Sequence, residues 1–356
     1  MRQKFVSIQY LRGLAALLVL ASHALLYPLV EHDLFYGRLG WLGVILFFVI
    51  SGFIMVAVTG EGRFSALDFL RRRFIRIVPM YWGATLIAAA LALAAPSLFK
   101  TTVYDTGQLI LSLFFIPFYN PVSGSIHPLY KLGWTLNYEV FFYVCFALLA
   151  FLGAQARVIW LTVAFAALSL IGMLFQPEPA IAKFYTTFMP LAFCAGAWLG
   201  LATLRGTITR LSTPAIAVVM VLGLLGLLEG FWLDRGGLVE DGLAFVGFVA
   251  FASGLVLLAV RFEARLPQIK LFELIGDASY SIYLVHIYEV AILSGIAFRM
   301  LDPGDLWADY FVAAVSIVGG TVAGILVYRW VEQPALRFFN GVFGKPRPKP
   351  VTAAAE

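Results

Sequence analysis

The chain has 356 residues, of which 62% are hydrophobic and only 13% are charged, and its formal net charge is +5. A soluble domain is about half apolar and about a quarter charged, so this composition excludes a soluble domain, a disordered chain and a fibrous protein. Apolar stretches of about 20 residues recur along the chain, which predicts an all-α, polytopic membrane protein. In such a protein a positive charge usually reflects topology, so we expect no nucleic-acid partner.

Eleven apolar segments follow one another along the chain. They are residues 8–29, 39–59, 77–95, 108–119, 133–152, 158–175, 185–203, 214–231, 242–260, 271–298 and 308–330. The fourth segment is short and holds Pro117, and a segment of about 10–14 residues is more often re-entrant or interfacial than spanning. We therefore expect about ten transmembrane helices in one integral membrane domain, residues 1–340, with a dipping or surface-lying piece near 108–119.

Basic residues gather in five regions between or beside these segments. The regions are the N-terminus, the 60–76 loop, the 204–212 loop, the 261–270 loop and the C-terminal tail. The positive-inside rule assigns all five to the cytoplasm, which is possible only if 108–119 does not cross. We therefore expect both termini to be cytoplasmic, in the inner (plasma) membrane. Residues 341–356 are basic and Pro-rich, and this composition predicts a disordered tail.

Arg12 and His23 are ionisable residues in the first span. Such residues are costly in a membrane and are functional candidates by default. Their separation of eleven residues puts both on one helix face, about 16 Å apart along the axis. The structural alternative is that Arg12 extends to the inner headgroups and His23 bonds a neighbouring helix.

Glu139 lies in the fifth segment, about 9 Å below its expected outer end. His23 lies at a similar depth in the first span, so the two side chains could meet. A carboxylate beside an imidazole fixes its tautomer and raises its basicity. The alternative is a protonated Glu139 bonded to a helix backbone.

A basic run, Arg71-Arg72-Arg73-Phe74-Ile75-Arg76, precedes the third span. Guanidinium groups bind phosphate bidentately, so this run suits a phosphate-rich ligand at the cytoplasmic entrance. The charges alone equally suit a topology anchor or a patch for anionic membrane lipids.

Two further stretches carry polar or small residues within apolar surroundings. In Ser-Tyr-Ser-Ile-Tyr-Leu-Val-His, residues 279–286, a polar stripe either lines a cavity or joins helices. In Phe-Phe-Val-Ile-Ser-Gly-Phe, residues 47–53, Ser51 and Gly52 form a small pair that allows close helix or ligand approach. Taken alone, each stretch favours a packing role. The four histidines are scattered without ligand spacing, so we expect no metal site.

Together these motifs resemble those of acyltransferase family 3, integral membrane enzymes that acylate carbohydrates at the bacterial surface. The resemblance runs from Gln9 to about Arg337, and its most specific element is Arg12-x10-His23. The other motifs follow in the family's order, through Trp134-x-Leu-x-x-Glu139 to Glu332-Gln333-Pro334. The opening is most similar to the shorter members that decorate exopolysaccharide. Thr135 departs mildly from the family pattern, where many members have Ser.

The resemblance implies cytoplasmic acyl-CoA, usually acetyl-CoA, as donor, and no permanently bound cofactor. It further implies an acceptor hydroxyl on a polysaccharide or lipid-linked oligosaccharide. The candidates for donor binding are Arg71, Arg72, Arg73, Arg76, Ser51 and Tyr81. The candidates for acceptor binding are Trp134, Asn137, Tyr280 and His286.

By the same resemblance, His23 is expected to act as general base, Glu139 to orient it, and Arg12 to hold the donor or stabilise the oxyanion. A covalent acyl-His23 intermediate is the open alternative. The competing class is a transporter or flippase of lipid-linked sugars, which also uses intramembrane charges. Transporters often carry inverted repeats, and no repeat is evident in this sequence.

Overall fold

The computed structural model describes residues 5–26, 34–96, 102–232, 242–300 and 306–343. These residues form helices, their connections and one isolated β-bridge between Tyr119 and Ile126. Within these described ranges, eight helical segments are long and apolar enough to cross a membrane. The expected class, an all-α polytopic membrane bundle, is therefore confirmed.

In the part of the chain that the structure describes, ten long helices correspond to the ten segments that the sequence predicts to span. They are α1 (Val6–Leu26), α2 (Leu34–Thr59), α3 (Ala66–Ala94), α5 (Trp134–Leu148), α6 (Ala154–Phe175), α8 (Pro190–Leu204), α10 (Thr213–Trp232), α11 (Gly242–Arg261), α13 (Ser279–Met300) and α14 (Leu306–Val327). The two outside the eight apolar spans are α5, with 15 residues, and α10, whose described apolar run is Pro214–Glu229.

Shorter elements connect the long helices. They are α4 (Thr106–Leu113), α7 (Ala180–Tyr185), α9 (Thr207–Arg210), α12 (Lys270–Asp277), α15 (Gln333–Phe343), the 3-10 turns Lys131–Gly133 and Glu263–Arg265, and the π-helical turn Tyr328–Glu332. The predicted 271–298 segment is thus two helices, α12 and α13. Helix α15 reaches Phe343, and the rest of the predicted tail lies outside the described residues.

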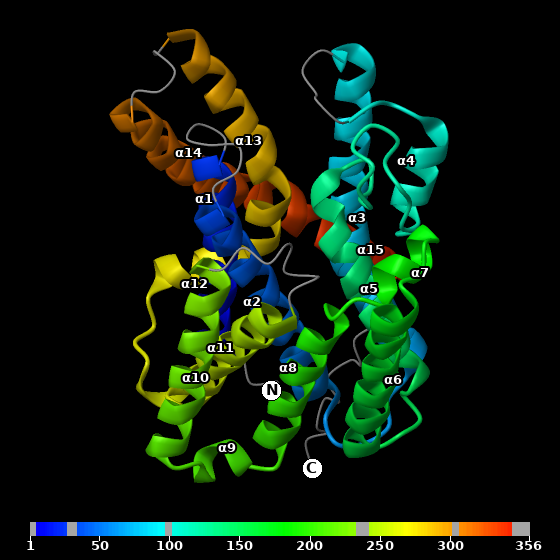
Figure 1. The fold of residues 1–356 in the computed structure, drawn as a ribbon, viewed down its shortest axis with the longest axis vertical. Coiled ribbons are helices and arrows are strands. Elements are labelled where there is room, and N and C mark those ends of the chain that lie inside the picture. The colour runs from blue at the N-terminus through cyan, green and yellow to red at the C-terminus, as the bar shows by residue number, and fades with distance from the viewer. Residues whose placement is uncertain (1–4, 27–33, 97–101, 233–241, 301–305, 344–356) are drawn as a thin grey trace, which may run out of the picture.

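The segment 108–119 does not cross the bundle. Its helix α4 has eight residues, a length of about 12 Å, against a hydrocarbon core of about 30 Å. Contacts on either side of this region agree with this arrangement, because the Phe64 amide donates to the Ala150 carbonyl at 3.2 Å and the Ala154 amide donates to the Glu61 carbonyl at 2.8 Å. The chain between these two contacts therefore runs away from this end of the bundle along α3 and comes back to it along α5 (Figure 1).

The basic run is helical, although the sequence suggests a loop over 60–76. Helix α3 begins at Ala66 because the side chain of Ser65 caps it, accepting from the Asp68 amide at 3.2 Å. Successive residues of a helix differ by about 100°, so Arg71 points away from Arg73 and Arg76, and Arg72 points between Arg71 and Arg76.

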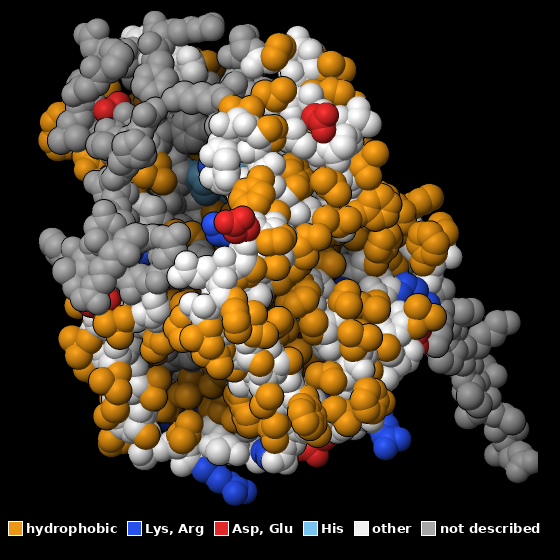
Figure 2. Space-filling model, turned by 45° about the vertical axis from the view of Figure 1, so that its right-hand side comes forward, with side chains coloured by type: hydrophobic (Ala, Val, Ile, Leu, Met, Phe, Trp, Pro, Cys, Tyr) orange, Lys and Arg blue, Asp and Glu red, His pale blue; other side chains and the backbone are white. Residues whose placement is uncertain are grey.

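Helices α1 and α2 lie at the centre of the molecule. Helix α1 packs against α2, α12, α13 and α14, while α2 also packs tightly against α8 (Figure 1). The α2–α8 contact depends on Gly52 and Gly196, because a Cβ on either would overlap a backbone carbonyl of the facing helix. On the outside, apolar side chains cover much of the face seen in Figure 2, with Lys and Arg at its lower edge.

The N-terminal end of α1 is held by the connection between α11 and α12. The Glu263 carboxylate accepts from the amides of Val6 at 2.7 Å and Ser7 at 3.0 Å. A carboxylate at a helix N-terminus satisfies free amides and complements the helix dipole. This contact places the N-terminal end of α1 on the same side of the bundle as the basic 261–270 segment.

Candidate active site

A cavity of about 310 Å³ lies among α1, α2, α3, α5 and α13. Six of the residues predicted from the sequence line it: Arg12, Ser51, Arg73, Arg76, Glu139 and Tyr280. Its other walls include apolar side chains such as Phe47, Phe48 and Ile54. An apolar pocket with a few convergent polar groups is the usual form of a small-molecule site.

Three arginines give the cavity a positive character. Arg12 donates to Gln9 Oε1 and to Ser279 Oγ, both at 3.0 Å, and Arg73 lies over the rings of Phe69 and Tyr143. Among the described residues no carboxylate lies within ion-pair distance of either guanidinium. Both side chains are part-buried, and a charge withdrawn from water is normally paired, so these two arginines suit an anionic ligand.

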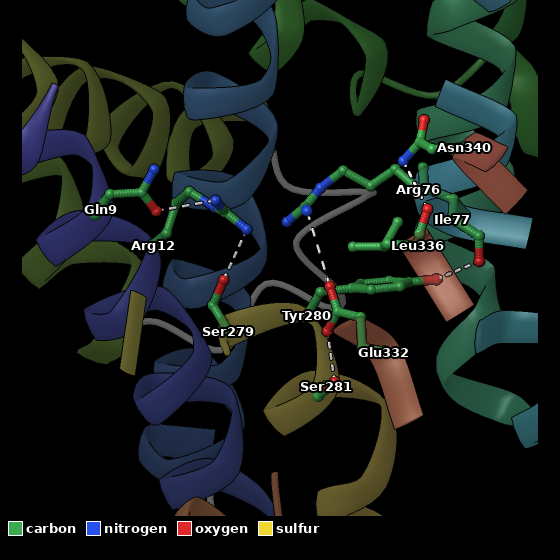
Figure 3. A network of polar contacts seen from close by, with 10 residues as sticks. All are labelled: Gln9, Arg12, Arg76, Ile77, Ser279, Tyr280, Ser281, Glu332, Leu336 and Asn340. Atoms are coloured by element: carbon green, nitrogen blue, oxygen red, sulfur yellow. Dashed lines mark hydrogen bonds and ion pairs between the residues drawn. The ribbon is translucent and has the colours of Figure 1, made fainter. Parts of the chain in front are cut away.

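Arg76 is the cavity arginine that has a carboxylate partner. Its Nη1 lies 3.8 Å from Oε1 of Glu332, and Ser281 Oγ donates to the other oxygen of Glu332 at 2.5 Å. Figure 3 shows Arg12 and Arg76 reaching toward one another from opposite sides of an open space, with Tyr280 along its lower edge. Tyr280 is anchored through its hydroxyl, which donates to the Ile77 carbonyl at 2.7 Å.

The π-helical turn Tyr328–Glu332 positions Glu332, which is fully buried. A π-turn holds an extra residue within a helix and is often found at functional sites. This turn lies between α14 and α15, and it brings the carboxylate to α3 and α13.

Ser51, Glu139 and Tyr143 form a second polar group in the cavity. Ser51 Oγ lies 3.2 Å from Glu139 Oε1 and 3.3 Å from the Tyr143 hydroxyl, which itself donates to Glu139. Glu139 and Tyr143 are four residues apart on α5 and so share one helix face. Ser51 reaches them from α2, while its neighbour Gly52 faces α8.

His23 lies beside His286 instead of Glu139. Nδ1 of His23 is 3.3 Å from Nε2 of His286, and no hydrogen bond or ion pair joins His23 to Glu139 within the described chain. The physical reason is lateral position, since α5 packs against α2, α3, α6 and α8, whereas His23 faces α13. Similar depths therefore do not bring the two side chains into contact.

The histidine pair lies next to the cavity, behind the ring of Tyr283. That ring lines the cavity, and its centroid is 6.0 Å from that of His286. Its hydroxyl is anchored to the Leu132 carbonyl at 2.9 Å and to Thr135 Oγ1 at 2.7 Å. His286 is fully buried, while His23 is part-buried.

The remaining predicted residues lie off the cavity lining. Arg71 is 3.7 Å from Asp68 at the start of α3, and Arg72 is its neighbour there. Tyr81 is buried and donates to the Ser112 carbonyl at 3.1 Å, so it anchors the end of α4. Trp134 packs on the ring of Trp41, with 5.2 Å between centroids.

Asn137, the last of these, is buried in α5. Its amide oxygen has no hydrogen-bond partner within the described part of the chain. Such an oxygen remains able to accept a hydrogen bond from a ligand or water.

The sequence did not mark Gln9 and Tyr143 as cavity residues, nor Glu332, named only as part of a motif, as the partner of Arg76. Helical spacing was a usable signal for Tyr143, four residues after Glu139, and for Gln9, three before Arg12. It also missed Glu289, an acid inside α13 whose two carboxylate oxygens have no hydrogen-bond partner among the described residues. An acidic residue within an apolar span was its signal.

Comparison with known proteins indicates the same family as the sequence motifs do. A family model described as an acyltransferase domain matches residues 5–330. The exopolysaccharide production protein ExoZ of Rhizobium meliloti (strain 1021) is 33% identical over 315 residues, covering 88% of this chain and 95% of that protein.

Two other relatives are more distant. Acyltransferase MdmB of Streptomyces mycarofaciens is 24% identical, covering 96% of this chain and 93% of its own. The peptidoglycan O-acetyltransferase OatA of Listeria monocytogenes serovar 1/2a (strain ATCC BAA-679 / EGD-e) is 26% identical, covering 95% of this chain and 58% of its own. No solved structure matches the chain.

Proposed function

Because the chain belongs to the acyltransferase domain family, we propose that it is a membrane O-acyltransferase that uses acyl-CoA, with acetyl as the expected acyl group. The proposed acceptor is a hydroxyl of an exopolysaccharide, another surface glycan or its lipid-linked precursor. The names of two relatives support this class of acceptor, since one acts in exopolysaccharide production and another is a peptidoglycan O-acetyltransferase. The proposed location is the inner (plasma) membrane.

The observation that carries the proposal is the arginine-lined cavity beside a histidine pair. Arg12 and Arg73 have no carboxylate partner in the described structure, and Arg76 has one. The phosphates of a CoA donor would supply the missing negative charge, since guanidinium groups bind phosphate oxygens bidentately. Arg71 and Arg72, at the start of the same helix, extend this positive region.

The polar group in the cavity suits the remainder of such a donor. The pantetheine arm carries two amides, each with one donor and one acceptor. The Glu139 carboxylate would accept from an amide N–H, and the Ser51 and Tyr143 hydroxyls would donate to an amide oxygen. In this proposal Glu139 acts by positioning the donor, and apolar walls exclude water around the thioester.

The chemical step needs a base at the thioester, and we assign it to His23. Its neutral imidazole would take the proton of the acceptor hydroxyl while that oxygen attacks the thioester carbonyl. The tetrahedral intermediate would then expel the CoA thiolate, which takes the same proton back from His23. Arg12 is the candidate for stabilising the oxyanion, and Trp134, Asn137 and Tyr280 are candidates for contact with the acceptor.

Mass spectrometry of the surface polysaccharide tests the function. Three strains are compared: one lacking the gene, one complemented with the native chain, and one with His23→Ala at equal membrane abundance. We expect unchanged polymer, with an acyl mass that returns only with the native chain and whose increment identifies the group. Loss of the polymer itself, with acylation per sugar unaltered, would instead indicate a transporter.

The donor site is tested with purified protein in lipid vesicles. We expect Arg12→Ala and Arg76→Ala to raise KM for acyl-CoA by about 10-fold or more each, because removing a charged hydrogen bond costs about 1.5–3 kcal/mol. Arg210→Ala, an exposed arginine in α9, is the matched control and should leave KM unchanged. Equal KM values in all three variants would contradict the assignment of the cavity to acyl-CoA.

A further inference from the structure

The two histidines that face each other come from α1 and α13. Their ring centroids are 5.1 Å apart, and Nδ1 of His23 lies 3.3 Å from Nε2 of His286. Each ring also touches a carbonyl of its own helix, one turn earlier. Nδ1 of His23 lies 2.9 Å from the Val19 oxygen, and Nδ1 of His286 lies 3.2 Å from the Ile282 oxygen.

These carbonyls decide which ring nitrogens carry hydrogen. A carbonyl oxygen only accepts, so a hydrogen bond to it requires N–H at Nδ1 of both rings. A neutral imidazole carries one N–H, so Nε2 of both rings is then unprotonated. His286 Nε2 therefore accepts from His23 Nδ1–H, which it shares with the Val19 oxygen. If both rings instead carried N–H at Nε2, each Nδ1 would direct a lone pair at a carbonyl oxygen. The contacts with Val19 and Ile282 would then be lost, and only the contact between the two rings would remain.

From this arrangement we propose that His286 is a positioning residue, which holds His23 as the Nδ1–H tautomer and leaves Nε2 of His23 free to act as the base. The proposal rests on the transferase function given above. In a catalytic triad a carboxylate accepts the corresponding N–H. Here a neutral imidazole takes that place, and a neutral group costs less to bury in an apolar bundle than a carboxylate does.

The proton balance of the step is simple. His23 Nε2 takes the proton of the acceptor hydroxyl, and the resulting imidazolium keeps Nδ1–H directed at His286 and Val19. The proton then leaves from Nε2 to the CoA thiolate, and His286 stays neutral throughout. Full burial of His286 agrees with a role that acts through His23, in place of the contact with acceptor expected from the sequence.

Solid-state NMR tests the tautomers without any substrate. The full chain, labelled with ¹⁵N-histidine and held in lipid bilayers at pH 8, contains only four histidines. Single variants at His23, His127 and His286 assign the signals. We expect N–H at Nδ1 and an unprotonated Nε2 for both His23 and His286 in the native chain. In His286→Leu we expect His23 to become a mixture of tautomers. N–H at Nε2 of native His23, or a His23 spectrum unchanged by His286→Leu, would overturn the proposal.

Kinetics in vesicles provide a second readout. We expect His286→Leu to lower kcat by about 10- to 100-fold at unchanged KM for acetyl-CoA, because general-base catalysis contributes about 10²–10⁴-fold and part of it is lost. His286→Gln, whose Oε1 can accept from His23, should recover most of the loss. The control is Ile292→Ala, an exposed residue of the same helix.

The outcomes separate the two proposals. A native chain that transfers no acyl group contradicts the proposed function, whereas the NMR result is independent of activity. An active native chain with full kcat in His286→Leu, or with equal losses in His286→Leu and His286→Gln, overturns the positioning role.

Discussion

At the scale of single residues, burial of a charged group does not by itself identify a catalytic role. Arg157 is fully buried near the start of α6, yet it has a complete set of partners. It donates to the carbonyls of Gly62 and Leu152, both at 2.8 Å, and to Thr59 Oγ1 at 3.2 Å. Its guanidinium therefore joins the ends of α2, α5 and α6. Arg12 and Arg73, in contrast, face a cavity and have no carboxylate partner among the described residues.

His127 gives a residue-scale prediction about pH. It is 4% exposed in the connection before α5, where its ring nitrogens lie 2.9 Å from Ser123 Oγ and 3.0 Å from the Pro128 carbonyl. Burial lowers the pKa of His127 below its ordinary value of 6.5. Between the lowered pKa and 6.5 the unfolded chain binds the proton and the folded chain does not, so stability falls as the pH falls through this range.

The measurement is the pH dependence of thermal unfolding between pH 7.5 and 5. We expect the native chain to lose more stability on acidification than His127→Gln, with a difference of at most about 1.4 kcal/mol per pH unit. Other titrating groups are common to both proteins and cancel in the difference. Parallel curves would show that His127 does not contribute.

At the scale of elements, small residues set how closely the central helices approach. A Cβ added to Gly196 of α8 would overlap the Val49 carbonyl, and one added to Gly52 of α2 would overlap the Phe193 carbonyl. Because Ser51 precedes Gly52, the same close contact fixes the direction in which Ser51 points into the cavity. Packing and function are therefore coupled in this one motif.

Gly196→Ala tests this coupling. The added methyl group must push α8 from α2, and overpacking of this kind costs about 1–3 kcal/mol. We expect a clearly lower melting temperature in detergent and reduced activity. Gly295→Ala on α13, where an added Cβ meets nothing within 4 Å, is the matched control and should keep the native values. Equal melting temperatures for the two variants would contradict the packing argument.

At the scale of the whole molecule, several connections meet at the same end of the bundle. Hydrogen bonds join Glu61 and Phe64 to residues 150–154, and Arg205 donates to Gln155 at 2.7 Å. These contacts bring together the ends of α2, α3, α5, α6 and α8 that the sequence predicts to be cytoplasmic. Basic residues of the 60–76 and 204–212 regions, both expected in the cytoplasm, therefore lie on the same side of the structure. The orientation of that side relative to the membrane remains a prediction of the positive-inside rule.

Cysteine labelling tests the orientation. The native Cys145 and Cys194 lie within the bundle, Cys194 fully buried. In cells whose outer layers have been made permeable but whose inner membrane is intact, a membrane-impermeant maleimide should label Val103→Cys. It should label Arg63→Cys only after the inner membrane has been permeabilised. The native chain is the background control. The reverse pattern would place both termini outside.

The sequence alone determined the membrane class, the ten apolar segments that correspond to long helices and the short 108–119 segment, because these depend on apolar length and charge along the chain. It also identified six residues that line the cavity, since charged side chains in or beside apolar spans and the family motifs marked them. Only the tertiary structure decided which helices face each other. Depth along a span says nothing about lateral position, so the sequence could suggest Glu139 as the partner of His23, whereas the packing of α13 on α1 brings His286 there. The structure likewise separates Arg73 and Arg76, which line the cavity, from Arg71: the cap at Ser65 makes their segment a helix, and Arg71 lies about 140–160° around that helix from the other two.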